Sequence, residues 1–173
     1  MKIKIIVGIC ALAALLVWAA AVTTLSKRTL TRAAPEVRYT QLNGETFSTS
    51  DLRGKVVVVN FWGSYCTPCV KEMPNLVQAH ERFAPRGYET VSIAVRHDNP
   101  QRVIRFATRH ALPFRIALDS KGELAKEFGN VRITPTSFVI DRKGRILKRY
   151  VGEHDWAEFN RLVEQELRQE LRS

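Results

Sequence analysis

Apolar and polar positions alternate in blocks along this chain, and the first block differs from all the others. Residues 5–22 are apolar apart from Gly8, and as a helix they would span about 27 Å, close to the thickness of a bilayer core. Basic residues flank this block on both sides, so they do not indicate its orientation. Residues 1–26 are therefore predicted to be a membrane anchor, or a cleaved signal segment with Ala19-Ala20-Ala21 as its cleavage site.

The pattern after this block predicts a tether followed by one domain. Residues 27–36 are polar with few large apolar groups, and residues 37–173 form the predicted domain. Residues 37–47 look extended, with Asn43-Gly44 as a hairpin signal. Residues 56–62 are apolar except for one asparagine, which predicts a central strand buried on both faces.

Strands and helices alternate after this central strand. A helix is predicted to begin near Cys66 and to kink at Pro74. The other predicted elements are strands at 89–95, 114–118, 137–140 and 145–150, and helices that begin near residues 100, 122 and 156. This order predicts an α/β domain with a mixed sheet, helices on both of its faces and a late antiparallel hairpin.

Composition fits one globular domain with a short appendage. The chain has 173 residues, of which 45% are hydrophobic and 25% are charged. Its net charge is +10, but the basic residues are scattered and no nucleic-acid motif accompanies them, so no nucleic-acid partner is expected. A chain of this length buries a core without disulfide staples, and its three cysteines need another explanation. Cys10, inside the apolar block, is interpreted as a small buried hydrophobe.

The other two cysteines, Cys66 and Cys69, stand at the junction of the central strand and the following helix. This spacing closes a small disulfide ring, and free N–H groups at the helix N-terminus favour a thiolate on the first sulfur. The second sulfur lies one turn inside, so the outer sulfur can attack a partner disulfide and the inner one can resolve it. A zinc site would need a second Cys/His pair at ligand spacing, and a purely structural disulfide would close too short a loop to stabilise much. Redox activity is favoured, without a metal or another cofactor.

Four motifs carry a resemblance to a known family. They are Phe61-Trp62 before the cysteine pair, Glu72-x-Pro74, Ile133-Thr134-Pro135-Thr136 and Asp141-Arg-Lys-Gly144. With them the sequence, from about residue 36 to 170, resembles the TlpA-like thiol-disulfide oxidoreductases of the thioredoxin superfamily. The resemblance implies a thioredoxin-like mixed sheet flanked by helices, with an N-terminal β-hairpin extension and an anchor helix. Two residues depart from the pattern: Tyr65 replaces a common tryptophan, and Asn60 stands where thioredoxin has a buried acid.

The resemblance also implies roles for individual residues. Cys66, Cys69 and Glu72 are expected to be catalytic, and Glu72 would exchange a proton with the Cys69 sulfur one helical turn away. The alternative for Glu72 is an ordinary solvated helix acid. Pro135 is expected to be cis and to face the disulfide, and Thr134 is expected to pair with the substrate backbone. Trp62 is assigned to the same substrate-binding set.

The setting that the resemblance implies is the bacterial inner membrane. The chain would cross it once, with a monomeric domain in the periplasm, or would be exported and soluble if the first segment is cleaved. The expected reaction is reduction of protein disulfides with electrons from a membrane-embedded donor. Candidate substrates are apocytochrome c, its carriers and copper-delivery proteins.

Three other functions remain open at this stage. A copper chaperone of the same fold would need a distant histidine, and His110 and His154 are unassigned, although both are expected on the surface. A peroxiredoxin-like peroxidase would need a Pro and a Thr or Ser at set positions before Cys66, which are missing. A net oxidase or isomerase is the third, because Thr-Pro between the cysteines carries no charge that fixes the direction of electron flow.

Overall fold

The computed structural model describes residues 32–169, so the predicted anchor at residues 1–26 lies outside the described residues. The strands are β1 (Arg38–Thr40), β2 (Thr46–Ser48), β3 (Val56–Trp62), β4 (Tyr88–Ala94), β5 (Arg115–Leu118), β6 (Thr136–Ile140) and β7 (Ile146–Val151). The helices are α2 (Thr67–Phe83), α3 (Pro100–Arg109), α4 (Glu123–Glu127) and α5 (Trp156–Gln169), with 3-10 turns η1 (Ser50–Leu52) and η2 (Ala84–Arg86). No helix within residues 32–169 is both long and apolar enough to cross a membrane.

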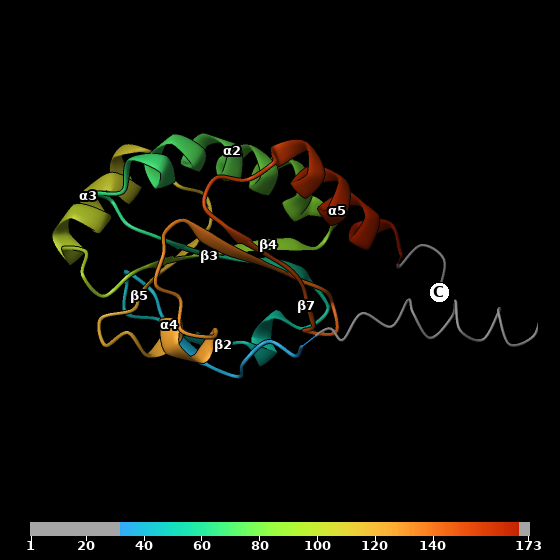
Figure 1. Ribbon diagram of the computed structural model, residues 1–173, viewed down its shortest axis with the longest axis horizontal. Helices are drawn as coiled ribbons and strands as arrows, with labels where there is room; N and C mark the ends of the chain where they lie inside the picture. The colour runs from blue at the N-terminus through green and yellow to red at the C-terminus, as the bar shows by residue number, and fades with distance from the viewer. Residues whose placement is uncertain (1–31, 170–173) are drawn as a thin grey trace, which may run out of the picture. The chain divides into compact units, whose positions relative to one another are not determined.

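Five strands form one mixed sheet in the order β5-β4-β3-β6-β7 (Figure 1). The β3–β4 and β4–β5 pairs are parallel, whereas β6 runs antiparallel to both β3 and β7. The predicted mixed sheet is thus confirmed, and β3 is its central strand, with all seven residues buried. β1 and β2 form a separate antiparallel pair in which Tyr39 lies opposite Phe47.

The two faces of the sheet bury two separate cores, because alternate residues of β3 point to opposite sides. Val56 and Trp62 pack with the helices α2, α3 and α5. Val57 and Phe61 pack with α4 and the β1–β2 pair. Figure 1 shows the same division, with α2, α3 and α5 above the sheet and α4 below it. Because both faces are covered, the ends of the strands are where loops and side chains can meet a partner.

From Val56 onward, each predicted strand and helix is confirmed, and the predicted boundaries differ from the observed ones by at most one residue. The apolar runs and the cap residues decide these elements locally, which explains the agreement. Helix α2 continues past Pro74, where the kink is predicted, as far as Phe83.

The described part of the predicted tether, residues 32–36, belongs to the domain. Ala33 forms a bridge with Arg145, the Ile146 N–H donates to the Arg32 carbonyl (2.8 Å), and the Ala34 N–H donates to the Gly144 carbonyl (2.9 Å). The start of β7 is at the sheet edge, where free backbone groups can accept such a partner. The incoming chain is therefore attached beside the turn between β6 and β7.

Asp155 caps α5, as its position before the helix predicts. Its Oδ1 accepts hydrogen bonds from the N–H groups of Glu158 and Ala157, each at 3.0 Å. These donors, Glu158 first, hold the pKa of the Asp155 carboxyl below its usual value. A lowered folded-state pKa stabilises the fold above the unfolded pKa, and this contribution is lost as the pH falls through the folded value.

We therefore expect Asp155→Ala to lower the melting temperature at neutral pH, because the carboxylate cap is lost. The difference in melting temperature between the variant and the wild type should narrow as the pH falls below about 4, where the carboxyl becomes protonated in the unfolded chain. Asp155→Asn keeps an accepting oxygen and is the matched control, which should lose less. A gap for Asp155→Ala that stays constant down to strongly acidic pH would contradict the assigned cap.

Candidate active site

Cys66 and Cys69 form a disulfide at the N-terminus of α2. Cys66 is the N-cap residue with an extended backbone, and its Sγ accepts a hydrogen bond from the Cys69 N–H at 3.4 Å. Pro68 occupies the first turn, where its missing N–H removes no helical hydrogen bond. The Cys66 sulfur thus lies against the free N–H groups of the helix end, which favours a thiolate once the disulfide is reduced.

The two sulfurs differ in exposure in the order that the sequence predicts. Cys66 is half-buried, whereas Cys69 is only 2% exposed and belongs to the core cluster that contains Met73. A sulfur of a partner protein therefore meets Cys66 first, and Cys69 is placed to attack from the inside.

The pairing of β3 with β6 explains how residues far apart in the sequence meet at the disulfide. Because the two strands are antiparallel, with Phe61 opposite Thr136, the residues before β6 lie beside those after β3. The carbonyl oxygen of Thr134 is 3.6 Å from the Cys66 Sγ. The Thr134–Pro135 peptide bond is cis, as predicted, and Pro135 is buried. The backbone at Thr134 therefore borders the disulfide directly.

A carboxylate that sequence reasoning missed holds the loop before the cysteines. Asp98 follows β4, is 8% exposed, and accepts hydrogen bonds from the Ser64 N–H and from the Ser64 hydroxyl, the latter at 2.7 Å. The available signal was its place after β4, because the carboxyl ends of parallel neighbours meet at one edge of the sheet. Asp98 thereby fixes the segment that leads from β3 into Cys66.

Glu72 lies on the buried face of α2, one turn beyond Cys69, and is 3% exposed. Its Oε1 accepts a hydrogen bond from the His154 N–H at 2.6 Å and lies 2.8 Å from the His154 Nδ1. The Glu72 Oε2 and the His154 Nε2 are also buried, and neither has a hydrogen-bond partner among residues 32–169. The interpretation of Glu72 as a solvated helix acid is therefore wrong.

The surface position expected for His154 is wrong as well, whereas His110 is exposed as expected. His154 sits between β7 and α5, with its ring centroid 5.0 Å from that of Tyr150, 4.7 Å from Trp156 and 5.6 Å from Phe159. These aromatic neighbours were the one local signal of burial. The contact that matters, to Glu72, joins residues 82 positions apart and has no local pattern.

Trp62 takes a different place from the one the resemblance implies. Its side chain is 0% exposed and packs on Phe106, with ring centroids 5.2 Å apart. It shares the core cluster with Cys69, because its position in β3 directs it to the α2 face of the sheet. The structure therefore places Trp62 in the core beneath the disulfide, away from a substrate-facing surface.

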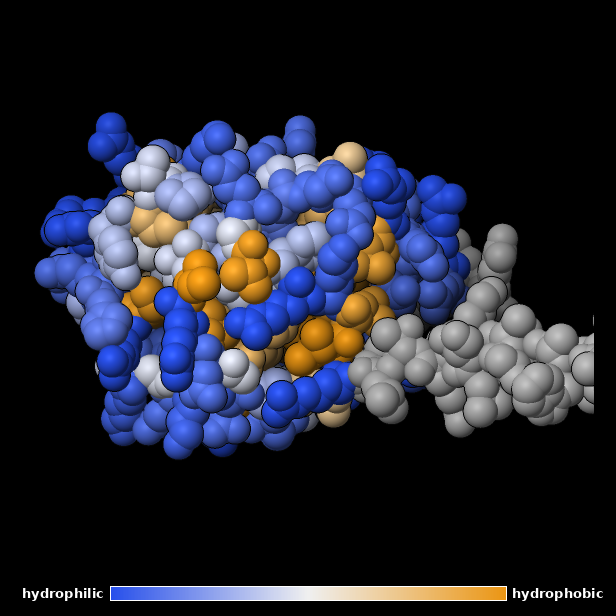
Figure 2. All heavy atoms as spheres, in the orientation of Figure 1, coloured by the Kyte–Doolittle hydropathy of each residue, from blue (hydrophilic) through white to orange (hydrophobic). Residues whose placement is uncertain are grey.

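Exposed apolar side chains surround the disulfide instead. In the described chain, the large hydrophobic side chains that are exposed are Tyr65 (51%), Ile133 (59%) and Val151 (53%). Tyr65 precedes Cys66, Ile133 lies just before the cis proline, and Val151 is opposite Thr136 in the sheet. The face drawn in Figure 2 is mostly hydrophilic at its edges, with several apolar side chains across its middle. An apolar rim at a redox-active disulfide suits contact with a protein chain.

Known proteins with a similar sequence or fold share this chemistry. Residues 30–165 match the redoxin family. The thiol-disulfide oxidoreductase ResA of Bacillus thuringiensis is 33% identical over 131 residues, which cover 76% of this chain and 75% of ResA.

Two solved structures superpose on most of the chain. A thiol:disulfide interchange protein of the thioredoxin family from Chlorobium tepidum has a TM-score of 0.72 and 32% identity, covering 79% of this chain and 97% of its own. StoA from Bacillus subtilis has a TM-score of 0.63 and 30% identity, covering 74% and 96%. With its thioredoxin-like fold and its Cys66–Cys69 disulfide, the chain is a thiol-disulfide oxidoreductase that belongs to the redoxin family and, within it, to the ResA- and TlpA-like members of the thioredoxin superfamily.

Proposed function

We propose that this protein reduces disulfides of particular protein substrates outside the cytoplasm, through the Cys66–Cys69 couple. The observation that carries the proposal is the unequal exposure of the two sulfurs at the start of α2. The Cys66 sulfur is accessible to a partner and the Cys69 sulfur is shielded behind it, which suits exchange with a protein disulfide. The apolar rim formed by Tyr65, Ile133 and Val151 supports a protein as the substrate.

The proposed reaction runs in two exchange steps. The Cys66 thiolate attacks one sulfur of the substrate disulfide, forms a mixed disulfide and releases the other substrate sulfur as a thiolate. The Cys69 thiolate then attacks the Cys66 Sγ and releases the second substrate sulfur. The substrate gains two electrons, and the Cys66–Cys69 disulfide forms again. A donor must supply two electrons before the next cycle.

Glu72 is proposed to take the proton of Cys69 when that thiol becomes the attacking group. It lies one helical turn from Cys69 on the same buried face of α2, and its Oε2 has no hydrogen-bond partner among the described residues. The bond from His154 to the Oε1 fixes the orientation of the carboxyl group. A shielded thiol has little water to receive its proton, so a positioned carboxylate speeds the resolving step.

The cellular setting is part of the same proposal. Residues 1–26 would anchor the monomeric domain on the outer side of the inner membrane, and a membrane-embedded donor would return electrons to the disulfide. Apocytochrome c, its carriers and copper-delivery proteins are the candidate substrates. The proposal is supported by the apolar block at residues 5–22 and by the similarity to ResA.

The reduction potential of the Cys66–Cys69 couple tests the direction of electron flow. A value near about −270 mV supports a reductase, and a value near about −120 mV identifies an oxidant instead. A peptide that carries an oxidised Cys-x-x-Cys-His segment, the haem attachment pattern, tests the substrate class. The reduced protein should reduce this peptide faster than a disulfide peptide of unrelated sequence, and equal rates would remove cytochrome c maturation from the proposal.

A further inference from the structure

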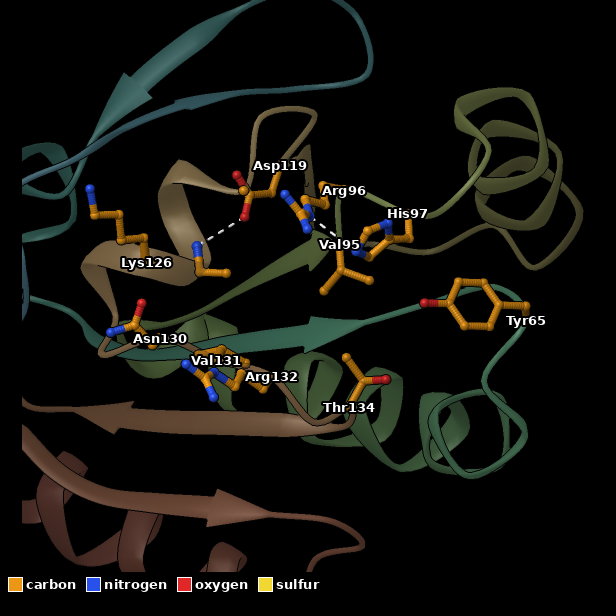
Figure 3. Close-up of a pocket in the computed structure, with 12 residues that line it drawn as sticks. Tyr65, Val95, Arg96, His97, Asp119, Lys126, Asn130, Val131, Arg132 and Thr134 are labelled. Atoms are coloured by element: carbon orange, nitrogen blue, oxygen red, sulfur yellow. Dashed lines mark hydrogen bonds between the residues drawn. The ribbon is translucent and has the colours of Figure 1, made fainter.

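A cavity of about 320 Å3 lies beside the disulfide, at the carboxyl ends of the parallel strands β3, β4 and β5 (Figure 3). Tyr65 reaches it from the loop after β3, Arg96 and His97 from the segment after β4, and Asp119 from the end of β5. Open α/β sheets bind ligands at this edge. Thr134, whose carbonyl oxygen is 3.6 Å from the Cys66 Sγ, lines the same cavity. The cavity and the disulfide therefore share a border.

The lining of this cavity carries a net positive charge. Three cations line it, Arg96, Lys126 and Arg132, and none of them forms an ion pair with a carboxylate in the described part of the chain. The one acid in the lining, Asp119, is 3% exposed. Its two carboxylate oxygens accept the N–H groups of Leu124 and Ala125, at 3.0 and 2.9 Å. Both carboxylate oxygens of Asp119 are thus bonded to the backbone at the start of α4.

Two groups of basic residues elsewhere on the domain are paired with acids. Arg82, Arg86 and Arg168 all pair with Glu164, at 3.0, 3.5 and 3.3 Å. Lys55 and Arg115 both pair with Glu89, at 3.2 and 3.5 Å. The cations of the cavity differ from these two groups because they lack a carboxylate partner among residues 32–169. Arg102, Arg105 and Arg109 of α3 lack one as well, but they are exposed and do not line the cavity.

We propose that this cavity is a subsite for a carboxylate side chain of the substrate, on a residue close to the cysteine that Cys66 attacks. Figure 3 shows Arg96 and His97 on one side of the cavity and Arg132 and Thr134 on the other, with the Tyr65 hydroxyl directed toward it. A peptide whose sulfur reaches Cys66 must pass over Tyr65 and Thr134, so its neighbouring side chains are brought to the cations. The proposal rests on the exchange reaction of the preceding section but holds for either direction of electron flow.

The test compares disulfide peptides that are identical except for one residue next to the reactive cysteine, which is Asp, Asn or Lys. The reduced protein is mixed with each peptide, and the second-order rate of Cys66–Cys69 oxidation is followed by tryptophan fluorescence, since Trp62 shares a cluster with Cys69. At low ionic strength we expect the Asp peptide to react about three- to tenfold faster than the Asn peptide, and the Lys peptide to react slowest. The preference should shrink in about 1 M salt, where charges are screened within about 3 Å.

Three variants locate the preference on the protein. Arg96→Gln and Arg132→Gln should each lower the Asp-to-Asn rate ratio. Arg109→Gln is the matched control, because Arg109 is an exposed cation of α3 that does not line the cavity. It should leave the ratio as it is in the wild type.

Two results would overturn the subsite. One is equal rates for the Asp and Asn peptides with the wild type, and the other is the same loss of preference in Arg109→Gln as in Arg132→Gln, which would indicate general steering by net charge. The Asn peptide measures exchange itself. If the Asn peptide reacts and the ratio is one, the subsite fails while the oxidoreductase function stands.

Discussion

Replacing Cys69 with Ser is expected to turn the protein into a trap that retains its substrates as mixed disulfides. Cys66 is half-buried and would still attack a partner, but no inner thiol would remain to release it. Turnover should be abolished, and covalent complexes should appear on non-reducing electrophoresis of cells that express the variant. Mass spectrometry of these complexes would name the substrates directly.

Cys66→Ser is the control for this experiment. Cys69 is only 2% exposed, so this variant should trap no partner although it also retains a single thiol of the pair. The reduced wild type should likewise be alkylated at Cys66 well before Cys69 at neutral pH. Equal alkylation of both thiols, or trapping by Cys66→Ser, would contradict the assigned roles.

Glu72→Gln should give the second-largest effect, on the pH dependence of the couple. Gln keeps the shape of Glu and an oxygen for the His154 N–H, but it cannot hold the proton of the Cys69 thiol. We expect a normally folded protein with slower turnover at neutral pH, by about 10²-fold at most, as for the loss of a general acid–base group. The measurement is the midpoint potential and the exchange rate as functions of pH. An unchanged pH profile would show that Glu72 has no part in proton transfer.

The groups around Glu72 decide how this result is interpreted. Tyr150 contacts His154, and burial raises the pKa of Tyr150 to about 12, so it stays protonated throughout the neutral range. Lys71 and Glu153 form an exposed ion pair nearby in the sequence, at 3.2 Å. The group that touches the Glu72 carboxyl is His154 itself.

His154→Asn completes the comparison. It retains the backbone N–H bond to Glu72 and removes the ring, so the pH profile should shift while turnover falls less than in Glu72→Gln. Alanine variants are less informative here, because removing one partner of a buried hydrogen bond leaves the other group unsatisfied, at a cost of about 1–3 kcal/mol of stability. Melting curves of both conservative variants should stay close to that of the wild type.

The sequence predicts the secondary structure correctly wherever neighbouring residues in the chain decide it. The apolar run at residues 56–62 predicts a buried central strand, and Cys66 with Pro68 predicts the start of α2, since strand burial and helix capping depend on neighbours in the chain. Asn60 shows where such reasoning ends. Its amide donates to the Ser137 hydroxyl at 2.9 Å and its Oδ1 accepts from the Ser92 hydroxyl at 3.3 Å, two partners supplied by the neighbouring strands.

The parts of the site that could not be predicted are all long-range contacts. His154 is buried because α5 and β7 bring it to Glu72, and Asp98 reaches Ser64 because β4 lies beside β3. Trp62 was assigned from resemblance to substrate binding, and only the packing of Phe106 from α3 shows that it is covered. Composition and spacing carry no information about such pairings.

The incoming chain is attached beside the β6–β7 turn, at a distance from the disulfide. Arg32 and Ala34 are bonded at the end of β6 that is opposite to Thr136, and Thr136 lies at the disulfide end. The five residues of β6 separate these ends by about 13 Å, in four steps of about 3.3 Å. The disulfide and the attachment of the incoming chain are therefore at opposite ends of β6. A protein that docks over Cys66 would meet the end of the sheet that the segment at residues 32–34 does not cover.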